Sequence, residues 1–141
     1  MGWRSFLQGG AALLCIGGVI YALATNPGVA DTQAHLVVMK ADATALLRRG
    51  GKLASRSEGA KYGSAFLYRQ FWDEGWSRAL VSDYEAELSS RGWKKRDDAT
   101  LEYCKDGILA RIVPQSGMSN HQGTNSIVMK YDAETIRRCA R

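Results

Sequence analysis

Apolar side chains fill the segment from Phe6 to Ala24 almost without interruption. The segment has 19 residues, and Gln8 is its only strongly polar side chain. As a helix it spans about 28 Å, close to the hydrocarbon thickness of a bilayer. We therefore expect a transmembrane or signal helix, whose membrane contacts come from its larger apolar side chains: Phe6, Leu7, Leu13, Leu14, Ile16, Val19, Ile20 and Tyr21.

The charges around this segment predict its orientation. Arg4 precedes it and Asp31 is the first charge after it, so the positive-inside bias keeps the N-terminus in the cytoplasm and exports the rest. The length of the apolar run favours a retained anchor. The alternative is a cleaved signal peptide, because small residues precede Ala24 and Ala30 in the pattern of signal-peptidase sites.

Beyond the helix breakers Pro27 and Gly28, apolar residues recur at helical spacing as far as Leu47. We expect a helix there with Asp31 or Thr32 as its N-cap. A strand over His35 to Lys40 is the alternative. Residues 48–63 are polar, basic and rich in glycine, which predicts a loop.

The next two segments have different periods. Residues 64–72 alternate with aromatic side chains on both faces, which predicts a strand. From Ser77 the apolar positions Leu80, Val81, Tyr84 and Leu88 fall on one helical stripe. Gly92 suits a left-handed residue after that helix, and Trp93 would then pack on Leu88 as in a Schellman motif.

Three further strands are expected, at residues 100–105, 107–113 and 126–132. Asp106 and Gly107 form a turn signal that predicts a hairpin between the first two. The loop from Pro114 to Asn125 separates the second from the third, and a short helix or tail over 133–141 closes the chain. The pattern predicts an N-terminal segment, 1–30, and one α+β domain, 31–141, with an antiparallel sheet packed on a helix.

The end of the second helix carries a motif, Tyr84-x3-Leu88-x3-Gly92-Trp93. With the strand before it and the strands after it, the region of residues 64–132 resembles a module of small bacterial lipoproteins and secreted proteins. In that group the helix packs on an antiparallel sheet, and many members have no assigned activity. The resemblance implies a bacterial inner-membrane protein with its domain in the periplasm, or a periplasmic or secreted protein if the leader is removed.

Composition and charge narrow the class of partner. Apolar residues make up 45% of the chain and charged residues 23%, which is typical of a folded globular domain. The net charge is +5, and the basic residues form only short clusters, such as Lys94, Lys95 and Arg96. We expect these clusters to be solvated and expect no nucleic-acid partner, because an exported domain meets little nucleic acid.

Three cysteines are present, and Cys15 lies within the apolar N-terminal segment. Cys104 and Cys139 are then an even pair in an oxidising compartment, where a disulfide is the default expectation. Two free thiols are the alternative.

Candidate catalytic groups are sparse. His35 and His121 complete no recognised zinc pattern, so we expect no metal and no cofactor. The adjacent carboxylates Asp97 and Asp98 are expected to be solvated, since neighbouring side chains usually point apart. The sequence therefore predicts a protein without enzymatic activity.

The aromatic cluster around residues 71–76 is the best candidate site. Trp72 and Trp76 flank an acidic turn, and Arg69 lies on the strand that leads to them, so these three residues form the expected interface with a protein partner. Closure of the core by the two tryptophans is the alternative. A small exported binding domain fits a toxin-immunity protein. It fits equally an accessory subunit of a membrane complex, and a small envelope hydrolase is the third class considered.

Overall fold

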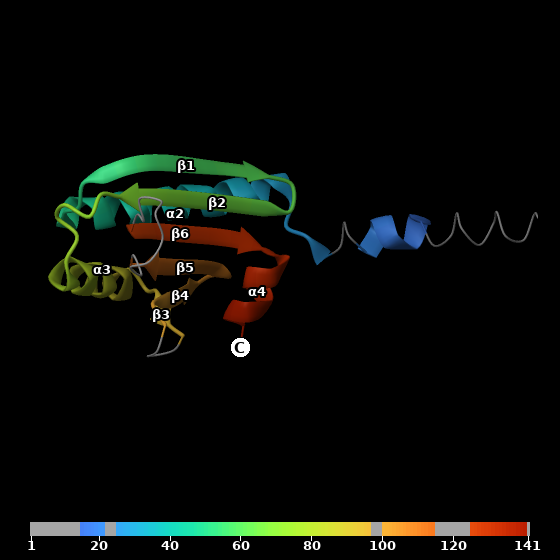
Figure 1. Cartoon of the computed structure of the whole chain (residues 1–141). Helices are drawn as coiled ribbons and strands as arrows, with labels where there is room; N and C mark the ends of the chain where they lie inside the picture. Colours follow the sequence, from blue (N-terminus) through green and yellow to red (C-terminus); the bar gives the residue numbers. More distant parts are fainter. Residues whose placement is uncertain (1–14, 22–24, 97–99, 115–124, 141) are drawn as a thin grey trace, which may run out of the picture.

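The computed structural model describes residues 15–21, 25–96, 100–114 and 125–140. They form an α+β structure whose elements after residue 28 are arranged along one sheet (Figure 1). Their order is α2 (Val29–Arg49), β1 (Leu53–Lys61), β2 (Ser64–Phe71), α3 (Arg78–Ser90), β3 (Lys94–Lys95), β4 (Glu102–Lys105), β5 (Ile108–Val113), β6 (Asn125–Asp132) and α4 (Ala133–Cys139).

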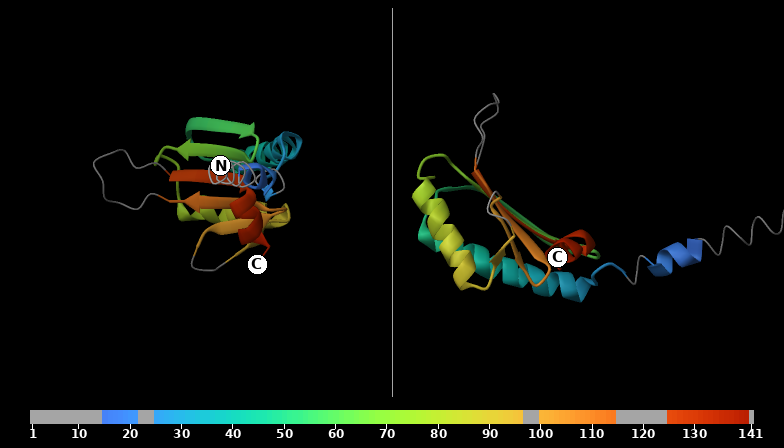
Figure 2. Two further views of the ribbon diagram at one scale, coloured as in Figure 1. Left: turned by 90° about the vertical axis from the view of Figure 1, so that its right-hand side faces the viewer. Right: turned by 90° about the horizontal axis from the view of Figure 1, so that it is seen from below.

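The six described strands form one antiparallel sheet in the order β1-β2-β6-β5-β4-β3. β6, the last strand in sequence, lies between β2 and β5, so the C-terminal part of the chain completes the centre of the sheet. β1 and β3 are the two edges. Figure 2 shows α2 and α3 on one face of this sheet and α4 on the other side of it. The predicted α+β class with an antiparallel sheet packed on helices is confirmed.

The core lies between the sheet and the pair α2 and α3. Every second residue of β2 is buried, from Ala65 through Leu67 to Phe71, and these side chains meet Met39 and Leu46 from α2. Burial of such a contiguous apolar layer is the dominant stabilising term of a small domain.

α3 follows the sequence pattern closely. The Ser77 hydroxyl accepts the N–H of Leu80 and caps the helix, and the stripe Leu80, Tyr84 and Leu88 is buried. Beyond the C-terminus Gly92 has a φ of +84°, and the N–H of Trp93 donates to the carbonyl of Leu88 at 3.1 Å. The predicted Schellman motif is confirmed.

α2 confirms the predicted helix but corrects its start, and it rules out a strand over His35 to Lys40. The helix begins at Val29 with Gly28 as N-cap, and no side chain caps it. The prediction of Asp31 or Thr32 as N-cap was wrong because both lie inside the first turn. There Thr32 is buried and its hydroxyl donates to the carbonyl of Val29, while the Asp31 carboxylate lies near the positive end of the helix dipole.

β1 corrects a second prediction. Residues 48–63 were expected to form a loop, yet residues 53–61 pair with β2 along nearly their whole length, with a register shift between Leu53 and Ser55. The strand forms because β2 supplies its hydrogen-bond partners. It looks like a loop in the sequence because an edge strand can be polar on both faces.

The three C-terminal strands lie where the pattern predicted them. Lys105 pairs with Ile108 across Asp106 and Gly107, whose φ values of +49° and +80° are those of a two-residue hairpin turn. Residues 133–139 form α4, so the helical alternative for the C-terminal segment is confirmed.

The N-terminal segment is described only in part. Residues 15–21 are helical, and Ile16, Val19, Ile20 and Tyr21 are exposed; Figure 1 shows this stretch standing away from the sheet. Within the described parts of the chain, no helix has the length and apolar character needed to span a membrane. Most of the predicted span, residues 6–14 and 22–24, lies outside the described residues.

Candidate functional site

Arg69 does not share a surface with the two tryptophans. It faces α2 on the same side of β2 as Leu67 and Phe71, and only 7% of its surface is exposed. Its guanidinium donates to the Glu58 carboxylate and to the carbonyl of Tyr68 at 3.0 Å. Hydrogen bonds from Lys40 and Arg69 lower the pKa of Glu58. The ion pair between Arg69 and Glu58 therefore connects the edge strand β1 to β2.

Trp72 is the exposed member of the predicted set. It follows buried Phe71 on the opposite side of the chain, and 44% of its surface is exposed. Its backbone N–H donates to the carbonyl of Lys52 at 2.9 Å, which extends the pairing of β1 and β2 by one residue. The backbone of Trp72 is thus fixed while its indole remains accessible.

Trp76 is half-buried and closes one end of the core. Its ring centroid lies 5.3 Å from that of Phe71 and 5.9 Å from that of Tyr84. Tyr84 is itself anchored, since its hydroxyl donates to the carbonyl of Gly50 at 2.6 Å and burial raises its pKa to about 12. The alternative that Trp76 packs as part of the core is therefore supported.

A hollow of about 510 Å³ opens beside Trp76. Its apolar wall is formed by Trp76, Val81, Leu101 and Pro114, and its polar wall by Ser77, Arg78, Glu85 and Asn125. We call this feature the Trp76 hollow. An apolar wall with a few polar groups is typical of a site that buries a side chain from a partner.

The turn that carries both tryptophans is held by specific contacts. The Asn125 amide donates to the Asp73 carboxylate at 2.8 Å, and the N–H of Trp76 donates to the Asp73 carbonyl at 3.0 Å. Gly75, at φ +87°, provides the left-handed residue of the turn. The turn is therefore a preorganised part of the fold.

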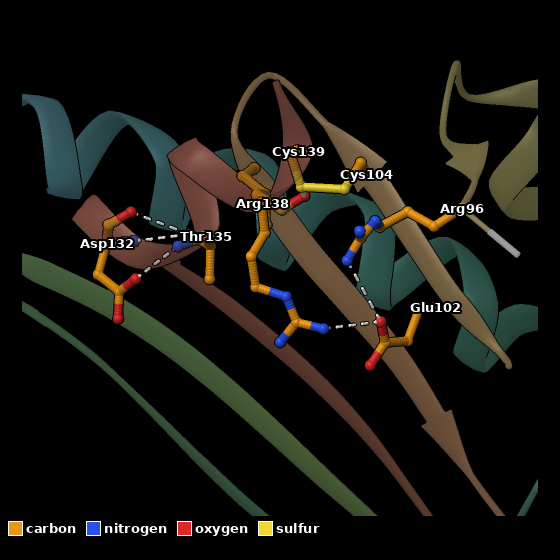
Figure 3. Close-up of a disulfide and its surroundings, with 8 residues drawn as sticks. Arg96, Glu102, Cys104, Asp132, Thr135, Arg138 and Cys139 are labelled. Atoms are coloured by element: carbon orange, nitrogen blue, oxygen red, sulfur yellow. Dashed lines mark hydrogen bonds and ion pairs between the residues drawn. A yellow bond between two sulfur atoms is a disulfide. The ribbon is translucent and has the colours of Figure 1, made fainter. Parts of the chain in front are cut away.

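The disulfide lies on the other side of the sheet from α2. Cys104 of β4 and Cys139 of α4 are bonded, as expected from the even pair, and Figure 3 shows the bridge between strand and helix. Asp132 and Thr135 form a capping box that begins α4. Burial opposes ionisation of Asp132, but hydrogen bonds from Lys130 and the backbone of Thr135 outweigh it and lower its pKa.

A second hollow, of about 620 Å³, lies along the disulfide. The charged residues of its lining that the structure describes are five cations and one carboxylate: Lys94, Lys95, Arg96, Lys105, Arg138 and Asp106. We call it the basic groove. The residues come from β3 and Arg96 after it, from the end of β4 and the hairpin turn, and from α4, so the fold gathers charges that are far apart in the sequence.

Three guanidinium groups in and beside this groove share one carboxylate. Arg138 lies 3.1 Å and Arg96 3.7 Å from the nearly buried Glu102, and Arg111 donates to it through Nε at 3.0 Å. Figure 3 shows Arg96 and Arg138 both directed at Glu102. One negative charge cannot neutralise three positive charges, so the cluster keeps a positive excess at the surface.

Two further lysines of the groove form ion pairs with carboxylates from α2 and α3. Lys105 donates to Asp42 at 2.9 Å, and that carboxylate also accepts from Trp93 and Arg91. Lys95 donates to Glu85, whose pKa is lowered by the hydrogen bond from Tyr103 and by Lys95 itself. By contrast, Lys94 is exposed and makes no ion pair with any described residue.

The remaining candidates for chemistry are structural or lie outside the described residues. His35 stacks on Tyr131 with ring centroids 3.7 Å apart. Within the described part of the chain, no three His, Cys, Asp or Glu residues come close enough to hold a metal. Asp97, Asp98, His121 and residues 115–124 of the Pro114 to Asn125 loop are not described.

One side of the groove, Lys94 to Arg96, was visible in the sequence as a short basic cluster, which we expected to be solvated. It missed Lys105 and Arg138, because nothing in the sequence places the hairpin turn and α4 beside β3. The expected disulfide was the one available signal, since a bridge between Cys104 and Cys139 brings residues 105 and 138 together.

Comparison with known proteins found no family model, no curated protein and no solved structure that matches the chain.

Proposed function

We propose that this chain is a membrane-tethered, extracytoplasmic protein-binding domain that acts by contact and without catalysis. The apolar segment from Phe6 to Ala24 and the charges beside it support the tether and its orientation. The disulfide supports an oxidising compartment such as the periplasm.

One observation carries the binding role. The turn between β2 and α3 carries the exposed indole of Trp72 and contributes Trp76 to the hollow. In Figure 1 this turn lies at the end of the sheet opposite the start of α2. A tether at one end leaves the aromatic end free to meet a partner. Tryptophan is enriched among the residues that dominate binding energy.

Two roles fit such a domain. As a toxin-immunity protein, it would cover the active surface of an envelope-targeted toxin. As an accessory subunit, it would be held in a membrane complex by its N-terminal helix, and its domain would cover the exported side of that complex. The identity of the bound protein separates them, since an immunity protein binds a toxin and an accessory subunit binds a membrane enzyme or transporter.

Site-specific photo-crosslinking in the native membrane tests the proposal. A benzophenone side chain is placed at Arg78, on the rim of the Trp76 hollow, in the full-length chain. We expect one discrete adduct. The adduct should disappear with Trp72→Ala, while the melting temperature stays within a few degrees, because exposed substitutions change stability by only about 0.5 kcal/mol.

The matched control places the same probe at Ser57, which is exposed on β1 at the edge of the sheet. An equally strong adduct from Ser57, or an adduct from Arg78 that survives Trp72→Ala, would argue against binding at the aromatic end.

A further inference from the structure

We infer that the basic groove is a second binding site, and that its ligand is an acidic, extended segment of a protein partner. This inference deepens the proposed function in one respect, since it assumes that the partner is a protein. The groove is separate from the Trp76 hollow, so the two sites can be tested independently.

The shape of the groove favours a chain segment. Its volume of about 620 Å³ exceeds the 510 Å³ of the Trp76 hollow, and it runs along the disulfide from β3 to α4. A single small anion would leave most of this volume unfilled, whereas several consecutive side chains would occupy it. A flat lipid surface would reach only its rim.

The charge of the groove favours acidic side chains. Arg96 and Arg138 share the single carboxylate of Glu102 with Arg111, and Lys94 has no ionic partner among the described residues. Among the described residues, Asp106 is the only carboxylate in the lining. Cations that exceed their internal partners attract external carboxylates, and arginine can hold them with paired hydrogen bonds.

Four of the five cations are also held in place before any ligand arrives. Arg96 and Arg138 are fixed by Glu102, Lys95 by Glu85 and Lys105 by Asp42. The disulfide fixes the distance between the strand and the helix that carry the two walls. These four side chains have little freedom left to lose on binding, which favours affinity.

The test uses the full-length chain in neutral detergent and a fluorescein-labelled hexaglutamate peptide, followed by fluorescence anisotropy. We expect binding that weakens strongly as salt rises, because exposed charges are screened within about 10 Å at 0.1 M salt. Hexaglutamine with the same label should not bind.

Charge variants locate the site. Lys94→Glu should weaken hexaglutamate binding by roughly fivefold, since it replaces one exposed attraction with a repulsion. Asp106→Asn should strengthen binding, and asparagine tolerates the positive φ at that position. Lys61→Glu, the matched control, makes the same charge change on the exposed end of β1 and should have no effect.

Three outcomes would overturn the inference. Equal weakening by Lys61→Glu and Lys94→Glu would show attraction to net charge alone. Displacement of the peptide by inorganic phosphate at an equal concentration of charge would show a site for small anions. Absence of peptide binding, whether or not the chain binds phosphatidylglycerol vesicles, would exclude a protein segment.

Trp72→Ala separates this inference from the proposed function. It should abolish the Arg78 adduct and leave hexaglutamate binding unchanged. If the wild-type chain forms the Arg78 adduct but does not bind hexaglutamate, the groove alone is rejected. If it binds hexaglutamate but forms no Arg78 adduct, the aromatic end alone is rejected.

Discussion

Trp72 and Trp93 show how position determines what an indole does in this domain. Trp93 is 3% exposed, follows the left-handed Gly92, and donates from its ring N–H to Asp42 at 2.8 Å. Trp72 has a fixed backbone and an exposed ring. The first residue therefore belongs to the stability of the fold, whereas the second is available for contact.

The first prediction concerns this difference. Trp93→Ala should lower the free energy of unfolding by about 3 kcal/mol or more, because it leaves a large cavity and removes a donor from a buried carboxylate. Chemical denaturation measures the loss. Trp72→Ala is the control and should change the free energy of unfolding by no more than about 0.5 kcal/mol. Similar losses for the two variants would contradict these different roles.

Arg69 shows what a strand pattern can and cannot reveal. The alternation along residues 64–72 was enough to predict β2, and it already placed Arg69 on the side of Leu67 and Phe71. Only the structure shows that this side faces α2 and that Arg69 forms an ion pair with Glu58, which lies opposite Leu67 on β1, because β1 itself was not predicted. An arginine on a strand can be an interface anchor or an internal ion pair, and the neighbouring strand determines which.

Among the elements, those with their own periodicity were predictable and those that depend on neighbours were not. α3 has an apolar stripe, a serine cap and a glycine after its end, so its bounds follow from local chemistry. β1 is polar on both faces and becomes a strand only through pairing with β2. The N-cap of α2 was misplaced because Asp31 and Thr32 are good capping residues that here lie within the first turn of the helix.

Two glycines at similar backbone angles give a prediction at the scale of the elements. Gly92 ends α3 at φ +84° with no atom near the position of a new Cβ, whereas Gly107 has φ +80° and would place a Cβ 3.0 Å from Ile136 of α4. Gly92→Ala should cost about 1–2 kcal/mol from backbone strain alone. Gly107→Ala should cost roughly 1 kcal/mol more, because the side chains of Ile136 and Tyr131 must move to make room for the new Cβ.

Thermal and urea denaturation of the two alanine variants checks this comparison. Equal losses would show that α4 moves away from the hairpin turn without cost, and would weaken the view that the turn and α4 are packed as one unit.

At the scale of the whole molecule, the disulfide connects the last helix to a strand 35 residues earlier. α4 has only seven residues, too few to be stable alone in water. The bridge therefore holds the helix that supplies one wall of the basic groove.

Removal of the bridge gives the prediction at this scale. Cys104→Ser with Cys139→Ser should lower the free energy of unfolding by up to about 4 kcal/mol, the loop-closure value for a loop of this length. Denaturation of the wild-type protein with and without reductant should give the same difference. The double variant should not respond to reductant, and a reductant effect on it would point to a different cause.

The candidate sites were predictable only in part. The aromatic end could be found because Trp72 and Trp76 are close in the sequence. The basic groove was not predicted, because its cations come from three separate segments, and only the expected disulfide indicated that residues near Cys104 and Cys139 meet.

The two edges of the sheet have a consequence for how copies of the chain behave in a crowded compartment. β1 exposes Arg56 and Lys61, and β3 consists of Lys94 and Lys95. The one carboxylate of β1, Glu58, is already occupied by Lys40 and Arg69. Two molecules that approach edge to edge would therefore bring together Arg56, Lys61 and Lys94, which have no ion-pair partner among the described residues. Charged edges of this kind oppose the strand pairing between molecules that leads to aggregation.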